Sequence, residues 1–321
     1  MTTISQRERR MPSLAGATEW LNSESLTPAA LQGRVVLIDF GTYTCINWLR
    51  TLPHIRAWAE TYAEHGLVVV GIQTPEFEFE RNLDSVGREV KAREIDWPVA
   101  VDNRYEIWQT FSNHYWPALY FVDREGVIRH HHFGEGRYEE SERVIQQLLG
   151  SAPQDLVTVD GEGDEAEADW ARLNSAETYL GYERTDNFAS PGGVGLGEAR
   201  VYAAPDRLKL NQWALSGDWT MERERVSLNA AGGRIFFRFQ ARDVHLVLRR
   251  TGQGGPVPFR VLLDGEGPAA ARGVDADADG NGHVDDDRLY QLVRQPGAVE
   301  ERTFEITFHA SGVEAYVFTF G

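Results

Sequence analysis

One segment constrains the fold of this chain most, RVVLIDFGTYTCINWLRTLP at residues 34–53. The near-continuous apolar run over 34–40 is typical of a central strand that is buried on both faces. A short turn follows, and Cys45 then opens a segment with helical periodicity that extends to about residue 65. We expect Pro53 to kink this helix, because proline lacks the backbone donor that a helix interior needs. The segment therefore predicts a buried strand, an exposed turn and a cysteine at the N-terminus of a helix.

Cys45 is also the only cysteine among the 321 residues. The chain cannot form an internal disulfide, so any thiol chemistry would use one sulfur of its own and an external partner. The N-terminus of a helix favours a thiolate, because its unpaired N–H groups and positive dipole end stabilise negative charge. Asp39 lies six residues earlier in the expected strand. If it is buried near the thiol, it could accept a proton or raise the pKa of the thiol by charge repulsion.

Length and charge narrow the class of protein. A chain of 321 residues predicts two domains. The formal charge of −17 argues against nucleic acid as a partner, and no apolar run approaches the ~18 residues of a membrane span. Residues 1–21 contain basic side chains without an apolar segment after them, so we predict no signal peptide. The protein would be cytoplasmic if Met1 is its natural start.

The first half of the chain alternates strands and helices. After the strand at 34–40 and the helix from Cys45, we expect strands at 66–74, 99–102 and twice within 118–134, and helices at 78–94 and 137–150. A strand–helix–strand order implies a right-handed crossover between parallel strands. Residues 1–150 therefore predict an α/β domain, a mixed sheet with helices on both faces.

The remaining residues change character twice. Residues 151–170 are acidic with little apolar periodicity, which predicts an interdomain linker that is mobile in part. Residues 171–321 contain short alternating strands between Gly, Asp and Asn turns, without a convincing helix. This pattern predicts an all-β domain of the sandwich or jelly-roll kind.

Several offsets around the cysteine resemble the thioredoxin superfamily. Asp39 lies where thioredoxins hold a buried aspartate, Pro53 matches their helix kink, and Trp116–Pro117 matches the cis-proline that faces the thiol. GLVVVGIQTPEFEFE and YWPALYFVDREG resemble, more narrowly, the TlpA-like redoxin region of DipZ-type proteins. In the second half, LNQWALSGDW and EAYVFTFG resemble the β domain of the same proteins. There the module follows a membrane electron-transfer segment and lies outside the cytoplasmic membrane.

Two positions depart from the redox members of that family. They would carry Trp at position 41 and Cys at position 48, whereas this chain has Gly41 and Trp48. The dithiol relay therefore does not transfer. The resemblance implies that Cys45 and Asp39 are the catalytic pair and that Pro117 shapes the substrate groove. We expect Thr42, Trp48 and Trp116 to border this groove as well.

Two classes of function stay open. In the first, the Cys45 thiolate attacks a disulfide, sulfenate or peroxide of a protein or small molecule, and an external thiol resolves the product without a cofactor. Thr42 and Cys45 have the Thr-x-x-Cys spacing of peroxiredoxins, but the proline that those enzymes need is absent, and Arg50 and Arg124 are candidates for their arginine only by abundance. In the second class, Trp48 plugs the groove beside the sulfur. The thioredoxin groove or the β domain of such a non-catalytic protein would hold a peptide, a thiol ligand or a glycan.

Two further patterns in the second half suggest ligands. The run D-x-D-x-D-G resembles the start of an EF-hand loop, with Gly280 at the sixth position. A structural calcium ion could bind there through Asp275, Asp277, Asp279, Asn281 and Asp286, although an exposed acidic hairpin loop is the simpler interpretation. A sugar could stack on aromatic residues of the expected strands, although such residues more often pack in the core; the candidates are Tyr202, Trp213, Trp219 and Tyr290.

Overall fold

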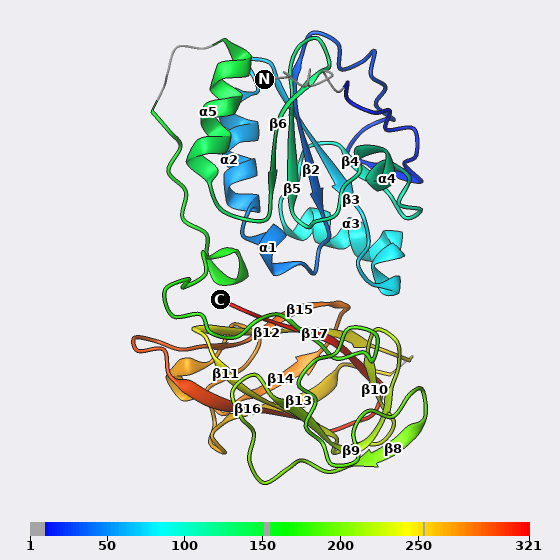
Figure 1. The fold of residues 1–321 in the computed structure, drawn as a ribbon, viewed down its shortest axis with the longest axis vertical. Helices are drawn as coiled ribbons and strands as arrows, with labels where there is room; N and C mark the ends of the chain where they lie inside the picture. The colour runs from blue at the N-terminus through cyan, green and yellow to red at the C-terminus, as the bar shows by residue number, and fades with distance from the viewer. Residues whose placement is uncertain (1–9, 151–154, 253) are drawn as a thin grey trace, which may run out of the picture. The chain divides into compact units, whose positions relative to one another are not determined.

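The structure, a computed structural model, describes residues 10–150, 155–252 and 254–321. The chain divides into two compact units, of which the first ends at Ala166 and the second comprises Glu167–Gly321 (Figure 1). The boundary falls inside the predicted linker 151–170, whose first four residues lie outside the described residues. Residues 1–9 of the N-terminal segment, for which no signal peptide was expected, lie outside them as well.

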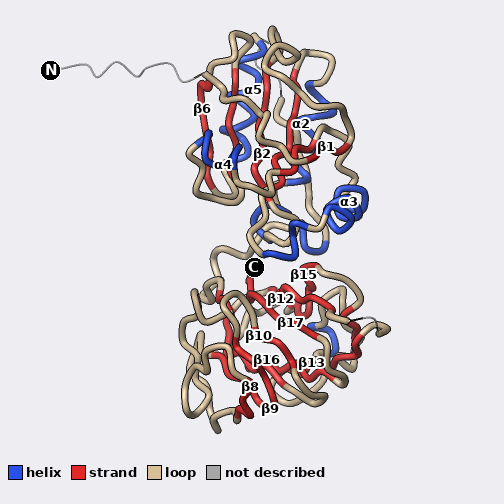
Figure 2. The backbone as a smooth tube through the Cα atoms, turned by 90° about the vertical axis from the view of Figure 1, so that its right-hand side faces the viewer, coloured by secondary structure: helices blue, strands red, loops and turns tan. Residues whose placement is uncertain are grey.

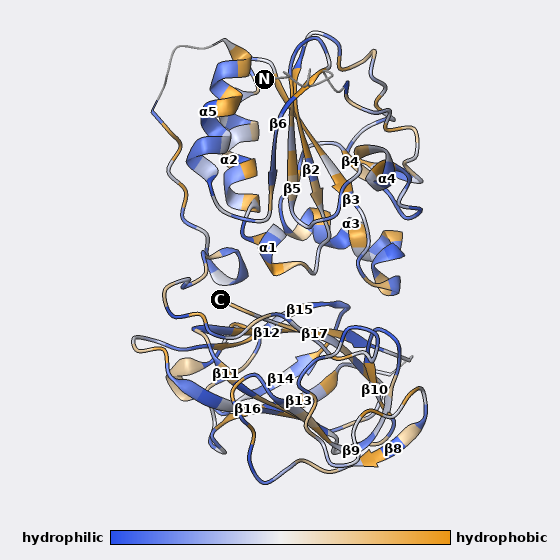
Figure 3. Ribbon diagram, viewed as in Figure 1, coloured by the Kyte–Doolittle hydropathy of each residue, from blue (hydrophilic) through white to orange (hydrophobic). Residues whose placement is uncertain are grey.

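The first unit contains a six-stranded mixed sheet in the order β1-β4-β3-β2-β5-β6. Its strands are β1 (Glu19–Leu21), β2 (Val35–Gly41), β3 (Leu67–Gln73), β4 (Val99–Val101), β5 (Ala118–Val122) and β6 (Ile128–Phe133). β2, β3 and β4 are parallel, while β1, β5 and β6 run antiparallel to their neighbours. The largely apolar strands β2 and β3 occupy the centre (Figure 3), as their continuous hydrophobic runs predicted.

Helices cover both faces of this sheet, as expected. They are α1 (Ile46–Leu49), α2 (Leu52–Tyr62), α3 (Leu83–Ala92), α4 (Glu106–Phe111) and α5 (Tyr138–Leu149). α2 and α5 pack on one face, and α4 packs on the other with the outer side chains of β2 (Figure 1). Among the described residues, no helix is long and apolar enough to cross a membrane.

Two predicted helices are interrupted for local reasons. The helix from Cys45 breaks between α1 and α2, because Pro53 in the first turn of α2 lacks an N–H and its ring would clash with the carbonyl of Leu49. The helix at 78–94 divides into a 3-10 turn, η1 (Glu78–Arg81), and α3. Asn82 separates the two by capping α3, where its side chain accepts the N–H of Ser85 at 3.0 Å.

The second unit is all β, as predicted, and its eleven strands form one antiparallel sheet. The strands are β7 (Thr178–Tyr179), β8 (Ala199–Tyr202), β9 (Trp213–Met221), β10 (Val226–Leu228), β11 (Arg234–Gln240), β12 (Asp243–Arg250), β13 (Val257–Leu263), β14 (Asn281–Val284), β15 (Arg288–Arg294), β16 (Glu301–Phe308) and β17 (Val313–Phe320). The sheet curls so that Phe237 and Phe259 of one part share a core with Leu246 and Phe318 of the other (Figure 2). The expected sandwich is thus built from a single folded sheet.

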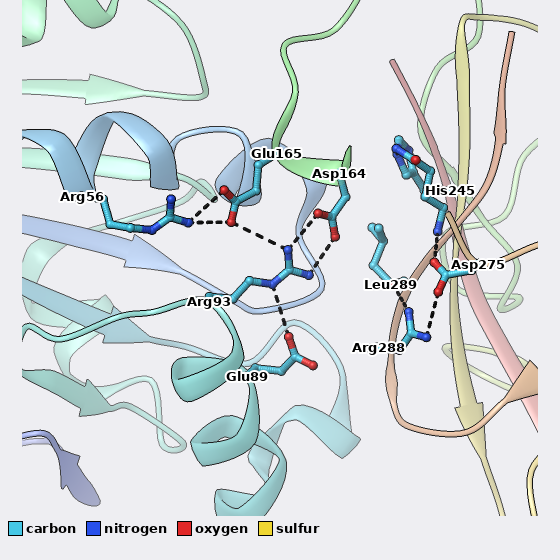
Figure 4. Close-up of polar contacts among 10 residues, drawn as sticks. Arg56, Glu89, Arg93, Asp164, Glu165, His245, Asp275, Arg288 and Leu289 are labelled. Atoms are coloured by element: carbon cyan, nitrogen blue, oxygen red, sulfur yellow. Dashed lines mark hydrogen bonds and ion pairs between the residues drawn. The ribbon is translucent and has the colours of Figure 1, made fainter. Parts of the chain in front are cut away.

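Residues 155–166, here called the strap, belong to the first unit although a free linker was expected. The N–H of Val157 donates to the buried carboxylate of Glu142 at 3.0 Å. Both side-chain oxygens of Asp164 lie 2.8 Å from the guanidinium of Arg93, and Glu165 binds Arg56 at 2.7 and 2.9 Å (Figure 4). The 3-10 turn η2 (Gly163–Glu165) packs against α1, the helix that begins directly after Cys45. Asp164 and Glu165, which belong to the acidic run predicted to be a linker, therefore bind this segment to Arg93 and Arg56.

Candidate active site

Cys45 is placed where the sequence predicted, at the N-terminal end of α1 after the turn that follows β2. Its N–H donates to the carbonyl of Thr42 at 3.0 Å, and its own carbonyl accepts the N–H of Leu49 at 2.9 Å. The side chain is partly exposed. The fold therefore presents the thiol at the surface on a backbone that is fixed on both sides.

The loop before β5 reaches the sulfur. The Trp116–Pro117 peptide bond is cis, as the resemblance implied, and the carbonyl oxygen of Trp116 lies 3.9 Å from Sγ of Cys45. The indole of Trp116 donates to the carbonyl of Thr74 at 3.0 Å and stacks at a tilt on Trp108, with ring centroids 4.3 Å apart. These contacts fix the carbonyl beside the thiol, so Trp116 and Pro117 border the reactive group.

Trp48 points into the protein. Its indole is 7% exposed and donates its N–H to Oδ2 of Asp39 at 3.0 Å. The ring also fills the space over Gly41, because a Cβ atom on that glycine would come within 2.1 Å of the indole nitrogen. Asp39 itself is 1% exposed, and burial raises its pKa to about 7 even though the Trp48 hydrogen bond lowers it. Trp48 thus joins Gly41 and Asp39, and the thiol is left partly exposed.

A second buried carboxyl group, which sequence reasoning missed, lies on the other side of the Cys45 turn. Glu80 of η1 is fully buried and accepts hydrogen bonds from the hydroxyl of Thr44 and the backbone N–H groups of Glu76 and Phe77. Burial raises its pKa to about 7 against the effect of these bonds. The sequence carried no signal for it, because the alternation of Glu with Phe in EFEFE groups Glu80 with the exposed Glu78 rather than with the buried Phe77 and Phe79.

The features that would make a peroxidase are not assembled around Cys45. Thr42 is buried, and its hydroxyl accepts from the side chain of Gln73 at 3.0 Å, so it does not border the groove as expected. Arg50 is buried and paired with Glu135 at 3.2 Å. Arg124 follows β5 at the end opposite to Pro117. Arg50 is thus engaged by Glu135, and Arg124 lies at the far end of β5 from the loop that reaches the thiol.

The acidic loop of the second unit uses its carboxylates locally. Asp275 pairs with Arg288 at 2.9 Å (Figure 4) and accepts the N–H of Gln291 at 2.7 Å. Asp277 accepts the N–H groups of Asp279 and Asn281 at 2.9 and 2.8 Å. In the parts of the chain that the structure describes, no three His, Cys, Asp or Glu side chains are grouped to hold a metal ion. The calcium site stays a prediction, and this geometry does not support it.

The aromatic residues considered for sugar stacking do not form a platform. Tyr202, Trp213, Trp219 and Tyr290 are all buried in the core of the second unit. The indole N–H groups of Trp213 and Trp219 donate to backbone carbonyls at 3.0 Å, which satisfies their polar atoms inside that core. Packing in the core accounts for these residues, which was the more common role expected for them, and they offer no stacking surface for a sugar.

Comparison with known proteins bears out the resemblance. The AhpC/TSA family matches residues 10–131, and the thioredoxin like C-terminal domain matches residues 175–321. The chain is thus similar to thioredoxin-like redoxins. It resembles Protein DipZ of Mycobacterium bovis and of Mycobacterium tuberculosis, each with 35% identity over 264 residues. The alignment covers 79% of this chain and 36% of either relative, so the chain spans about a third of their length.

Shorter relatives match the first unit. Thiol-disulfide oxidoreductase YkuV of Bacillus subtilis is 26% identical over 139 residues, which are 43% of this chain and 93% of that protein. A solved thioredoxin-like protein in its oxidized form is 27% identical and covers 46% of this chain and 99% of its own, with a TM-score of 0.42.

Proposed function

We propose that this protein is a thiol-dependent oxidoreductase that works through a single sulfur, that of Cys45. The observation that carries the proposal is that a partly exposed thiol lies beside the Trp116 carbonyl of a cis-proline loop. The position where a Cys-x-x-Cys motif would have its second cysteine holds the buried Trp48. The names of relatives support the reaction class, since YkuV is a thiol-disulfide oxidoreductase.

The proposed reaction is thiol–disulfide exchange. The Cys45 thiolate attacks one sulfur of a substrate disulfide, the S–S bond breaks, and the departing thiolate takes up a proton. The product is a mixed disulfide between Cys45 and the substrate. Because the chain has no second cysteine, only an external thiolate can attack this bond and return Cys45 to its reduced form. We assign proton handling to Asp39, which is buried and has a pKa near 7.

The proposal is tested by following the mixed disulfide directly. Reduced protein would be mixed with oxidised glutathione or a disulfide-linked peptide and examined by intact mass spectrometry, with Cys45→Ser as the matched control. We expect one adduct per chain in the wild type, stable until an external thiol is added, and none in the control. If the wild type forms no adduct while its fold is intact, Cys45 does not take part in thiol–disulfide exchange. A non-catalytic binding role for the groove or the second unit would then be preferred.

A further inference from the structure

Trp48 has little freedom to move. It lies in α1, three residues after Cys45, which caps the N-terminus of that helix. The indole passes over Gly41 at the end of β2, where even a methyl group would overlap the ring. The position that remains for the indole N–H is the one it occupies, directed at Asp39.

Asp39 depends on this contact. Its Oδ2 accepts the indole N–H at 3.0 Å, whereas its Oδ1 is buried and has no hydrogen-bond partner among the described residues. A carboxyl group removed from water keeps its charge only when donors compensate for the lost hydration. The N–H of Trp48 is such a donor, and it favours the charged form of Asp39.

We infer that Trp48 is a positioning residue for Asp39: its indole N–H holds the buried carboxyl on β2, the strand that leads into the Cys45 turn, and it thereby sets the pH range over which the thiol reacts. The inference rests on the proposed function, in which Cys45 is the reacting group. It assigns a role to the residue that stands in place of the second cysteine.

The effects of other titratable groups near Asp39 have to be distinguished from the effect of Asp39 itself. The elements around β2 carry several titratable groups, among them Cys45 and Arg50 of the α1 segment, His54 of α2, Glu80 of η1, His132 of β6, Glu135 of the loop after β6, and Glu142 of α5. Arg50 and Glu135 pair with each other, and Glu142 is bound by Trp58 and Tyr62. Glu80 shares with Asp39 a pKa that burial raises to about 7, so it needs its own control.

The direction of the effect follows from the hydrogen bond. Removal of the indole N–H takes away a bond to the charged form, so the pKa of Asp39 rises further above its ordinary value. One hydrogen bond to a charged group corresponds to about a tenfold fall in the ratio of carboxylate to acid at pH 7. An anionic Asp39 opposes formation of the Cys45 thiolate by charge repulsion. Loss of the N–H therefore makes the thiol more reactive between pH 7 and 8.

The test removes the N–H and keeps the ring. Trp48 is replaced in the full chain by 3-benzothienylalanine, in which sulfur takes the place of the indole N–H, and in parallel by the genetic variant Trp48→Phe. Titration of the Asp39 carboxyl is followed by carbon-13 NMR, with its signal assigned by Asp39→Asn. The rate of Cys45 alkylation by iodoacetamide is measured from pH 5 to 9 in the same samples and in Glu80→Gln.

We expect both Trp48 variants to move the Asp39 titration upward and to shift the matching inflection of the alkylation profile with it. Asp39→Asn should remove that inflection, and Glu80→Gln should leave the Asp39 signal in place. The inference is overturned if the carboxyl titrates as in the wild type, or if it shifts while the alkylation profile does not. Failure of the proposed function is seen separately, as absence of the mixed disulfide, because alkylation requires only an accessible thiol.

Discussion

A single methyl group at Gly41 should show how firmly Trp48 is held. In Gly41→Ala the new Cβ would lie 2.1 Å from the indole nitrogen and 2.3 Å from two ring carbons, so the ring has to move. Overpacking of a well-packed core costs about 1–3 kcal/mol. A displaced ring also leaves Asp39 without its donor, which costs roughly 1–3 kcal/mol more. We expect the free energy of unfolding of the first unit to fall by about 2–6 kcal/mol.

The matched background for this change is Trp48→Ala. That substitution alone should cost about 3–5 kcal/mol, because it removes a large buried ring. The three atoms nearest to a Cβ at position 41 all belong to the Trp48 ring, and the backbone there is that of a regular strand, so once the ring is gone the second change should cost little. The double-mutant cycle should therefore give a coupling energy of about 2 kcal/mol or more, which is typical only of residues in direct contact.

The measurement is urea unfolding, monitored by hydrogen-exchange mass spectrometry of peptides from β2. This readout is needed because the chain has two units, and a single transition cannot be assumed for both. An equal cost of Gly41→Ala in the wild-type and Trp48→Ala backgrounds would refute the reasoning, because the ring would then not be the obstacle.

Three further outcomes are expected from other residues of the first unit. Relative to the wild type, Asp39→Asn should become progressively more stable in urea titrations as the pH rises from 3.8 to about 7 and should gain nothing further above that, because a carboxyl whose pKa is raised from 3.8 to about 7 on folding contributes stability that is fully present below 3.8 and is lost once the pH has passed 7. His54 stacks on Tyr138 with ring centroids 3.6 Å apart, and burial lowers the pKa of His54 to about 4. Its contribution to stability is therefore present above pH 6.5 and is lost as the pH falls through 4. His54→Phe should make the melting temperature decline less steeply between pH 6.5 and 4. Arg93→Ala should raise hydrogen exchange in the strap about tenfold, as for loss of a charged hydrogen bond, whereas Lys91→Ala should not.

The elements that the sequence predicted are those whose signal is local. The apolar runs of β2 and β3 and the helical periodicity after Cys45 each lie within one window, and the structure places them as expected. α4 was missed because six residues carry too little periodicity. That helix depends on Asp102, whose carboxylate accepts the N–H groups of Ile107 and Trp108 at 3.0 and 2.8 Å.

The contacts that could not be predicted join distant residues. Arg93 and Asp164 are 71 positions apart, so the acidic run gave no sign of where its charge would be neutralised. Thr44 and Glu80 are 36 positions apart, and only the folded chain brings them together. The direction of Trp48 was open between the groove and the interior. Gly41 decides it, because the missing side chain provides the space that the indole fills.

The fit of Trp48 over Gly41 also limits the mutational paths open to this active site. A change of Trp48 to cysteine would add a second sulfur, but it would empty the space over the glycine and remove the donor of Asp39. A larger residue at position 41, introduced first, would collide with the ring. Each order passes through an intermediate that loses several kcal/mol from a domain with about 5–15 kcal/mol in total. Both routes between the one-sulfur and two-sulfur forms of the site thus pass through a destabilised protein, and single substitutions do not readily restore the missing cysteine.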